Sequence, residues 1–112
     1  MYPKEQIDSL KVICPGVQQG NEGGATYFLL LQLKLPDGCQ PAEVDVLLRP
    51  TNSGDGYNSR LYFAQPVQSQ KALNWTGQAR ILERNWHVFS WQVQAQNLTL
   101  VQILQEHLDA LR

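Results

Sequence analysis

The chain has 112 residues, of which 43% are hydrophobic and 17% charged, with a formal net charge of -1. This length fits one domain and excludes a two-domain enzyme, a full dinucleotide-binding sheet and a barrel of repeated strand–helix units. The balance of 9 basic against 10 acidic residues excludes the strongly basic surface that is typical of a small nucleic-acid-binding domain. We therefore treat residues 1–112 as a single domain that does not bind nucleic acid.

The first predicted element is a short helix that begins near Pro3 and ends before Pro15. Proline suits the first helical position, because its missing N–H would have no partner there. Ile7 and Leu10 are three positions apart and share one face of this helix. Residues 18–24 are rich in glutamine and glycine without the spacing of a phosphate-binding loop, so we expect an ordinary polar loop.

Three strands are predicted next, at Ala25–Leu35, Glu43–Arg49 and Leu61–Ala64. In the first, every second residue is apolar: Tyr27, Leu29, Leu31, Leu33 and Leu35. We expect this face to be buried along its whole length, with Leu31 at the centre of the core. The alternation resumes in the second run after an Asp-Gly turn, which predicts an antiparallel hairpin.

The remaining chain predicts a loop, a fourth strand region and a second helix. Residues 68–78 show no periodicity, whereas residues 81–82 and 86–93 have the character of a strand. Thr99 and Gln102 have the spacing of a capping box, which predicts a helix over Thr99–Leu111. The expected fold is α+β, with an N-terminal helix, an antiparallel meander of about four strands and a C-terminal helix packed on the sheet.

The candidate catalytic residues are two cysteines and two histidines, and none has a suitable setting. Cys14 ends the first helix, where the helix dipole disfavours a thiolate, and Cys39 lies in a turn. A nucleophilic cysteine needs a neighbouring base or a helix N-terminus. His87 and His107 lie on different elements without acidic partners at ligand spacing. We therefore predict no catalytic residue, no metal and no cofactor.

Aromatic residues give the clearest signal of a binding surface. Trp and Tyr are enriched at protein interfaces, although they also fill cores. We predict that Tyr62, Trp75, Trp86 and His87 contact a protein partner. For His87 the alternative is a structural histidine at the edge of the core.

The compartment is predicted from the absence of targeting signals. The N-terminus shows no signal-peptide pattern, and the longest apolar run, Tyr27–Leu31, is far shorter than the roughly 20 residues that a membrane span needs. Two distant cysteines fit reduced thiols better than a disulfide scaffold, although one long-range disulfide is compatible with secretion. We expect a soluble cytoplasmic protein that does not bind membranes.

Several motifs between Tyr27 and Arg112 resemble those of a known family. They are a strand ending in Leu35–Gly38, the segments Pro41–Pro50, Gly56–Tyr57 and Leu61–Phe63, and the later segment Arg84–Ser90. Together they resemble the bacterial ubiquitin-conjugating-enzyme-like family, which is found alongside ubiquitin-like modifiers, activating enzymes and deubiquitinase-type peptidases. The resemblance implies the fold of ubiquitin-conjugating enzymes and of their non-catalytic relatives, the RWD domains.

The chain departs from the catalytic pattern of that family. A conjugating enzyme carries its thioester cysteine after the meander, preceded by a His-Pro-Asn motif. Residues 67–112 contain no cysteine and no such motif, so no thioester can form at the usual place. The resemblance therefore implies the fold without the activity.

These observations lead to one hypothesis and two alternatives. We expect a non-catalytic, RWD-like adaptor that binds a ubiquitin-like modifier, or its activating or conjugating enzyme, in a bacterial system. The first alternative is a divergent conjugating enzyme with an atypical nucleophile, for which Cys39 would be the accessible thiol. The second is an unrelated small α+β binding or chaperone domain, which an obligate homodimer would favour.

Overall fold

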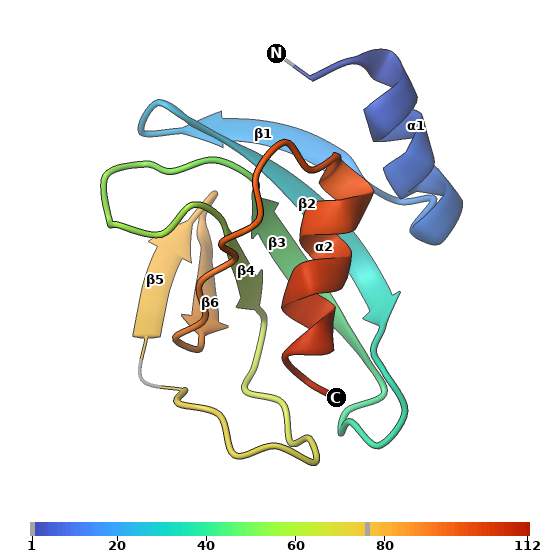
Figure 1. The fold of residues 1–112 in the computed structure, drawn as a ribbon, viewed down its shortest axis with the longest axis vertical. Coiled ribbons are helices and arrows are strands. Elements are labelled where there is room, and N and C mark those ends of the chain that lie inside the picture. Colours follow the sequence, from blue (N-terminus) through green and yellow to red (C-terminus); the bar gives the residue numbers. More distant parts are fainter. Residues whose placement is uncertain (1, 76) are drawn as a thin grey trace.

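The computed structural model describes residues 2–75 and 77–112. These residues form helix α1 (Lys4–Ile13), six strands and helix α2 (Leu100–Asp109), as Figure 1 shows. The strands are β1 (Gln18–Glu22), β2 (Ala25–Lys34), β3 (Glu43–Arg49), β4 (Arg60–Phe63), β5 (Gly77–Ile81) and β6 (Arg84–Val88). They make one antiparallel sheet in the order β1-β2-β3-β4-β6-β5. The α+β class, both helices and the three antiparallel strands β2, β3 and β4 are confirmed, but the sheet has six strands and not about four.

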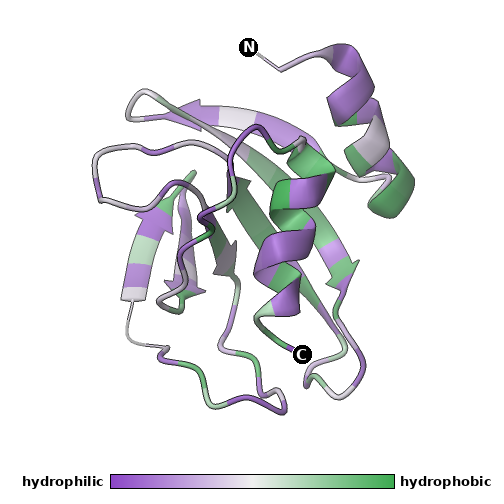
Figure 2. Ribbon diagram, in the orientation of Figure 1, coloured by the Kyte–Doolittle hydropathy of each residue, from purple (hydrophilic) through white to green (hydrophobic). Residues whose placement is uncertain are grey.

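The sheet is curled, and each of its faces covers a separate apolar cluster. The helix-side core contains Leu10, Phe28, Leu30, Val46, Phe63 and Leu104 among other residues. The inner cluster lies on the opposite face, within the curl, and consists of Ala25, Tyr27, Leu47, Tyr62, Ile81, Trp86 and Val88. Figure 2 shows the corresponding hydrophobic colouring along β2, β3 and one stripe of α2. Because both faces are apolar, the central strands are buried on both sides, which explains why β3 carries the consecutive buried residues Val46, Leu47 and Leu48.

The two edges of the curled sheet meet at Leu82, in the turn between β5 and β6. The backbone N–H of Leu82 donates to Oε1 of Glu22, on the opposite edge strand, over 3.2 Å. The side chain of Leu82 lies over Gly20, where an added Cβ would approach Cδ1 of Leu82 to 3.0 Å. Glycine at position 20 therefore permits the close approach of the two edges. The result is a half-barrel, in place of a flat sheet with an open second face.

A β-bulge in β2 changes which residues of this strand face the helices. The pairing with β3 shifts between Leu30 and Leu33, and Gln32 has a positive φ of 52°. Its backbone N–H donates to Oδ1 of Asp45 at 2.7 Å, which holds the bulge in place. Before the bulge, Phe28 and Leu30 belong to the helix-side core, and after the bulge, Leu33 and Leu35 belong to it. The expectation that a single face runs from residue 27 to residue 35 is therefore wrong, and Leu31 is only half-buried.

Strand β1 lies where the sequence predicted a loop, and strand β5 begins within the predicted loop 68–78 and ends at Ile81, which was predicted as strand. Strand β1 has exposed residues on both faces, so its polar sequence shows no alternation. It is held by backbone pairing to β2 along its length, which requires no apolar side chains. Strand β5 pairs with β6 through a two-residue turn in which Leu82 and Glu83 both have positive φ, 52° and 66°. Hairpin turns of this kind favour Asn and Gly, and neither occurs here, so the sequence carried no turn signal.

Helix α2 forms as the sequence predicts. Its N-cap is Thr99, whose side chain accepts the backbone N–H of Gln102, while the Gln102 side chain accepts the N–H of Thr99. This capping box satisfies two backbone donors that would otherwise have no partner. No helix within residues 2–75 and 77–112 is long and apolar enough to cross a membrane.

Candidate functional site

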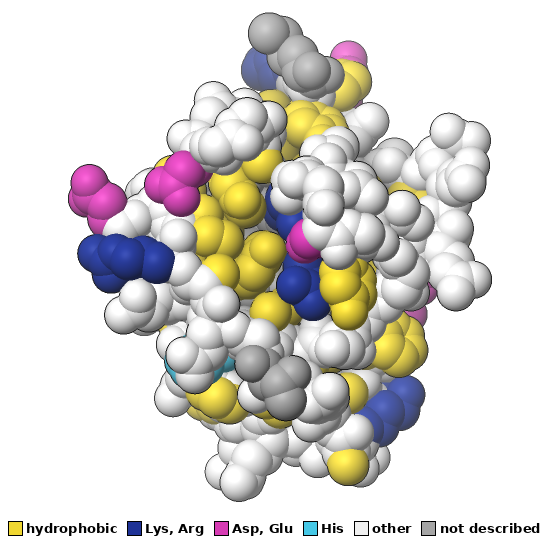
Figure 3. Space-filling model, turned by 90° about the vertical axis from the view of Figure 1, so that its left-hand side faces the viewer, with side chains coloured by type: hydrophobic (Ala, Val, Ile, Leu, Met, Phe, Trp, Pro, Cys, Tyr) yellow, Lys and Arg dark blue, Asp and Glu magenta, His cyan; other side chains and the backbone are white. Residues whose placement is uncertain are grey.

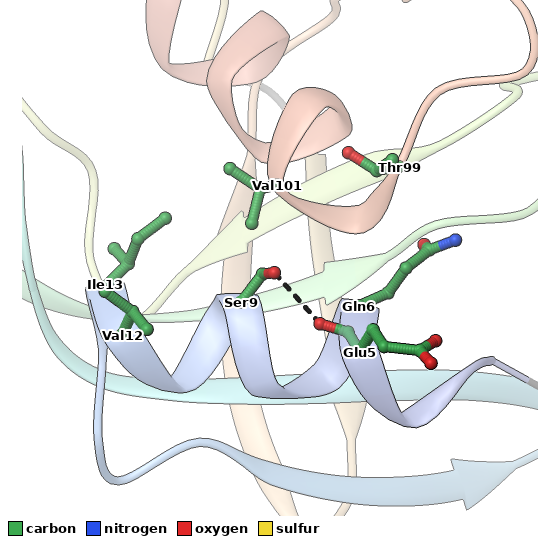
Figure 4. A pocket seen from close by; sticks show the side chains of 7 residues that line it. All are labelled: Glu5, Gln6, Ser9, Val12, Ile13, Thr99 and Val101. Atoms are coloured by element: carbon green, nitrogen blue, oxygen red, sulfur yellow. Dashed lines mark hydrogen bonds between the residues drawn. The ribbon is translucent and has the colours of Figure 1, made fainter.

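A surface groove lies between α1 and α2, and we call it the interhelical groove. Its volume is about 540 Å³, and it is lined by Glu5, Gln6, Ser9, Val12, Ile13, Thr99 and Val101. In Figure 4, Val101 projects from α2 toward α1, Val12 and Ile13 form one end, and Gln6 and Thr99 form the other. The groove is therefore apolar in its middle and at one end, with polar groups at the other end.

The helical repeat of α1 explains why these residues share a face. Glu5, Ser9 and Val12 are spaced by four and three positions, so they lie along one side of the helix. Leu10 and Ile7 occupy another side and pack into the helix-side core. Val12 is consequently 85% exposed, although valine is an apolar residue that usually contributes to a core. Helix α1 thus has one apolar side that is covered and a second, mixed side that is open and carries the apolar Val12.

Two hydrogen bonds fix the shape of the interhelical groove. Oε1 of Gln6 accepts the backbone N–H of Leu100 at 3.1 Å, which ties α1 to the first turn of α2. The Ser9 hydroxyl donates to the carbonyl of Glu5 at 2.9 Å, as the dashed line in Figure 4 shows. Because the hydroxyl proton of Ser9 is already donated within α1, Ser9 has no free hydrogen-bond donor for a ligand in the groove.

Acidic side chains flank this apolar surface on both helices. Glu5 lines the interhelical groove, and Glu106 lines a smaller depression on α2 that shares Val101 with it. Neither carboxylate belongs to an ion pair in the part of the chain that the structure describes. A ligand that combines apolar groups with positive charge would therefore complement this surface.

The four residues predicted to contact a partner do not form one surface. Trp86 is 1% exposed and Tyr62 is 5% exposed, and both belong to the inner cluster of the curled sheet. The Trp86 indole N–H donates to the carbonyl of Ile81 at 3.0 Å, which satisfies its only donor. These two side chains therefore have a role in the packing of this conformation.

The other two predicted residues are half-buried. Trp75 packs edge-on against Phe63 and Phe89, with ring centroids 5.1 Å and 5.0 Å away. His87 pairs with Phe63 between β6 and β4 and borders a small polar depression on the β5–β6 hairpin. Neither residue lines the interhelical groove.

Both cysteines are free thiols, and both are buried. Sγ of Cys14 donates to the carbonyl of Leu31 at 3.0 Å, and Cys39 belongs to the helix-side core. Burial raises the pKa of the Cys39 thiol, because a thiolate is poorly solvated there. The accessible thiol that the divergent-enzyme alternative requires is therefore not present at Cys39.

A buried serine–histidine pair was not predicted from the sequence. Oγ of Ser59 and Nε2 of His107 are 2.8 Å apart, and each residue is 2% exposed. Burial, with the positive charges of Arg60 and Arg49, lowers the pKa of His107 to about 4. A base with this pKa accepts a serine proton poorly at neutral pH, and neither group is open to a substrate. We therefore assign the pair a structural role, joining the start of β4 to the last turn of α2.

None of the residues that line the groove was predicted as a contact residue, including the exposed Val12 and Ile13. Ile7 and Leu10 define the apolar side of α1, and Val12 lies outside it. An apolar residue outside the buried side of a helix was the one feature of the sequence that indicated a second contact surface on α1. Within residues 2–75 and 77–112 no group of three or more His, Cys, Asp or Glu side chains could hold a metal ion.

Comparison of the chain with known protein families, with curated proteins and with solved structures found no match.

Proposed function

We propose that this protein is a non-catalytic protein-binding domain that docks its partner in the interhelical groove. The observation that carries the proposal is the apolar part of the interhelical groove, where Val12 is 85% exposed next to Ile13 and Val101. Large apolar side chains gathered in a concavity on the surface favour a protein ligand over continued exposure to water. The burial of both thiols favours binding over thioester chemistry.

The shape and charge of the groove favour one kind of occupant. The groove lies between two helices, and its apolar part is flanked by Glu5 and Glu106, which form no ion pair with the residues that the structure describes. An amphipathic segment whose apolar face is bordered by Lys or Arg would bury the valines and pair with both carboxylates. We therefore propose a partner that presents such a basic amphipathic segment.

The resemblance of the sequence to ubiquitin-conjugating enzymes and RWD domains suggests which partners to test. The order of elements in the structure, a helix followed by antiparallel strands and a C-terminal helix, agrees with that resemblance at the level of fold class. The proposed partner is a ubiquitin-like modifier, or its activating or conjugating enzyme, in the bacterial cytoplasm. In this proposal the domain is an adaptor that has the scaffold of a conjugating enzyme without its nucleophile.

The test is a titration of isotope-labelled protein, followed by NMR, with the ubiquitin-like modifier and the activating and conjugating enzymes of the same bacterium. Shifts confined to the amides of α1 and the first turn of α2 are expected with one of these proteins. Val12→Asp should weaken that binding by about tenfold or more, because it places a charge in the apolar contact. The matched control is Trp91→Asp, which changes an exposed apolar residue that does not line the groove.

Three results would contradict the proposal. The first is an absence of binding to all of these proteins, and the second is equal binding by the Val12→Asp variant and the wild type. The third is a stable homodimer in sedimentation experiments that Val12→Asp dissociates, which would assign the groove to a second copy of the chain. That third result would favour the unrelated binding or chaperone domain.

A further inference from the structure

Two arginines lie directly opposite each other on neighbouring strands of the curled sheet. Arg49, the last residue of β3, pairs in register with Arg60, the first residue of β4. Residues opposite each other on antiparallel strands point to the same face, and like charges in that position repel. Only Asp55, from the loop 50–59, forms ion pairs with them among the described residues. The cluster of these three side chains therefore carries one positive charge in excess.

Arg49 uses its guanidinium entirely within the protein. It is 1% exposed. Its Nε donates to the carbonyl of Thr51 at 2.7 Å, and its terminal nitrogens donate to Asp55, to the carbonyl of Tyr57 and, at 3.5 Å, to the hydroxyl of Tyr62. These bonds hold the loop 50–59 against the sheet. Arg49 has no donor left for a ligand.

Asp55 is likewise fully engaged by Arg49. Its two oxygens accept from the two terminal nitrogens of Arg49 at 2.8 Å and 3.0 Å, and Oδ1 also accepts the backbone N–H of Tyr57 at 3.0 Å. The hydrogen bond from Arg49 is the main reason that the pKa of Asp55 is lowered. Bidentate pairing of this kind is the strong mode of arginine–carboxylate recognition. The carboxylate therefore hydrogen-bonds to Arg49, whereas its contact with Arg60 is a longer ion pair of 3.8 Å without a hydrogen bond.

Arg60 is left without comparable partners. Its guanidinium carbon lies 3.9 Å from the centre of the Tyr57 ring, and its Nη1 is 3.8 Å from Oδ2 of Asp55. No hydrogen bond from Arg60 is formed to the described residues, and its Nε is buried without a partner. The side chain is 16% exposed, so part of it reaches the surface. Stacking on a ring uses the face of a guanidinium, and because Nε is buried, only the terminal nitrogens of Arg60 remain for a ligand.

The loop that carries Asp55 and Tyr57 lies on one side of the molecule. The loop 50–59 and β5 lie on the side of the molecule that Figure 3 shows, and there Lys or Arg atoms are recessed among hydrophobic side chains with one small acidic patch beside them. A recessed charge with apolar neighbours attracts an opposite charge more strongly than one that projects into water. The interhelical groove is built by the helices that pack on the other face of the sheet, so this location is independent of the proposed docking site.

We propose that Arg60, held by Tyr57 beside the Arg49–Asp55 pair, binds an oxyanion through the two terminal nitrogens of its guanidinium. The chemistry required of the ligand is a planar or tetrahedral anionic group with two oxygens that accept from one guanidinium, as in a carboxylate or a phosphate. Binding would supply the negative charge that Asp55 does not provide. The same chemistry is offered by a free or esterified phosphate and by the carboxylate at the end of a peptide chain.

Isothermal titration calorimetry at low ionic strength tests the proposal and distinguishes these two sources. The probes are inorganic phosphate, an acetylated alanine dipeptide with a free carboxylate, and the same dipeptide as its amide. Saturable binding of phosphate or of the free acid is expected, with no binding of the amide. The stronger of the two probes identifies the source.

Two variants connect the binding to Arg60. Arg60→Gln should weaken it by about tenfold or more, because a charge-assisted bidentate contact is lost. Arg80→Gln is the matched control, since Arg80 is an exposed arginine of β5 that bonds to Asn85, and its loss should change the affinity by less than about twofold. If Arg60→Gln does not fold, Arg60→Lys takes its place, because it keeps the positive charge and removes the two parallel N–H donors of the guanidinium. Arg60→Lys should still bind the anion several-fold more weakly than Arg80→Lys. Absence of saturable binding by both anions would overturn the proposal, as would equal affinities in the Arg60 and Arg80 variants.

Discussion

Ser59 and His107 form a hydrogen-bonded pair, 2.8 Å apart, that joins the strand side of the molecule to α2 where both residues are buried. They are 48 positions apart in the sequence, so only the tertiary structure brings them together. Arg49 and Arg60 raise the positive potential at the histidine. The pair consequently couples the packing of α2 to the protonation of one side chain.

The stability of the fold should fall as the pH is lowered from 7 to 5. The pKa of His107 is about 4 in the folded protein, below its ordinary value of 6.5, so the unfolded chain takes up the proton first. The stabilisation is present above pH 6.5 and is lost as the pH falls toward 4. Its loss between pH 7 and pH 5 should amount to about 2 kcal/mol in the free energy of unfolding. Urea denaturation at both pH values measures it, and His107→Gln should reduce the difference; an equal pH dependence in that variant would contradict the assignment.

The bulge in β2 predicts that two neighbouring leucines differ in their contribution to stability. Leu30 is fully buried in the helix-side core, whereas Leu31 is half-buried. Leu30→Ala should cost about 2–5 kcal/mol through lost burial and a cavity, and Leu31→Ala should cost clearly less. Chemical denaturation of the two variants gives the comparison. Equal costs would show that the bulge does not set the orientation of these side chains.

Arg49 should determine whether the loop 50–59 is ordered. Arg49→Ala removes five hydrogen bonds, and it leaves Asp55 without its main partner. We expect a loss of about 3 kcal/mol of stability and faster amide hydrogen exchange in peptides that cover the loop. Arg80→Ala, at an exposed position, should change stability by less than about 0.5 kcal/mol. A loop that exchanges at the same rate in both variants would show that Arg49 does not hold it.

Neither thiol should react readily in the native protein. Cys14 and Cys39 are buried, and the raised pKa of Cys39 disfavours its thiolate. A colorimetric disulfide reagent should label both residues quickly in denaturant and slowly without it, at the rate at which the protein opens. Fast labelling of one thiol under native conditions would reopen the alternative of a divergent conjugating enzyme.

Local sequence patterns predicted the elements in which buried and exposed side chains follow each other in a regular order. The alternation of Glu43, Val44, Asp45 and Val46 identified a central strand, although residues 46–49 are all buried, and the capping box at Thr99 identified the C-terminal helix. Strand β1 was not predicted, because both of its faces are exposed and its sequence therefore shows no alternation of apolar and polar residues. The turn at Leu82 and Glu83 was not predicted either, because both residues adopt a positive φ for which their residue types have no preference.

The sequence by itself determined the α+β class, the two helices and the absence of a cysteine after residue 67. It did not determine which side of each element would find a partner, because that depends on contacts between residues distant in the chain. The bulge at Gln32 redirected the leucines of β2, and the contact of Leu82 with Gly20 curled the sheet around Trp86. The docking of α1 beside α2 left Val12 in water next to Val101. A periodic pattern reports that a side chain is apolar, and only the tertiary structure decides whether another element covers it.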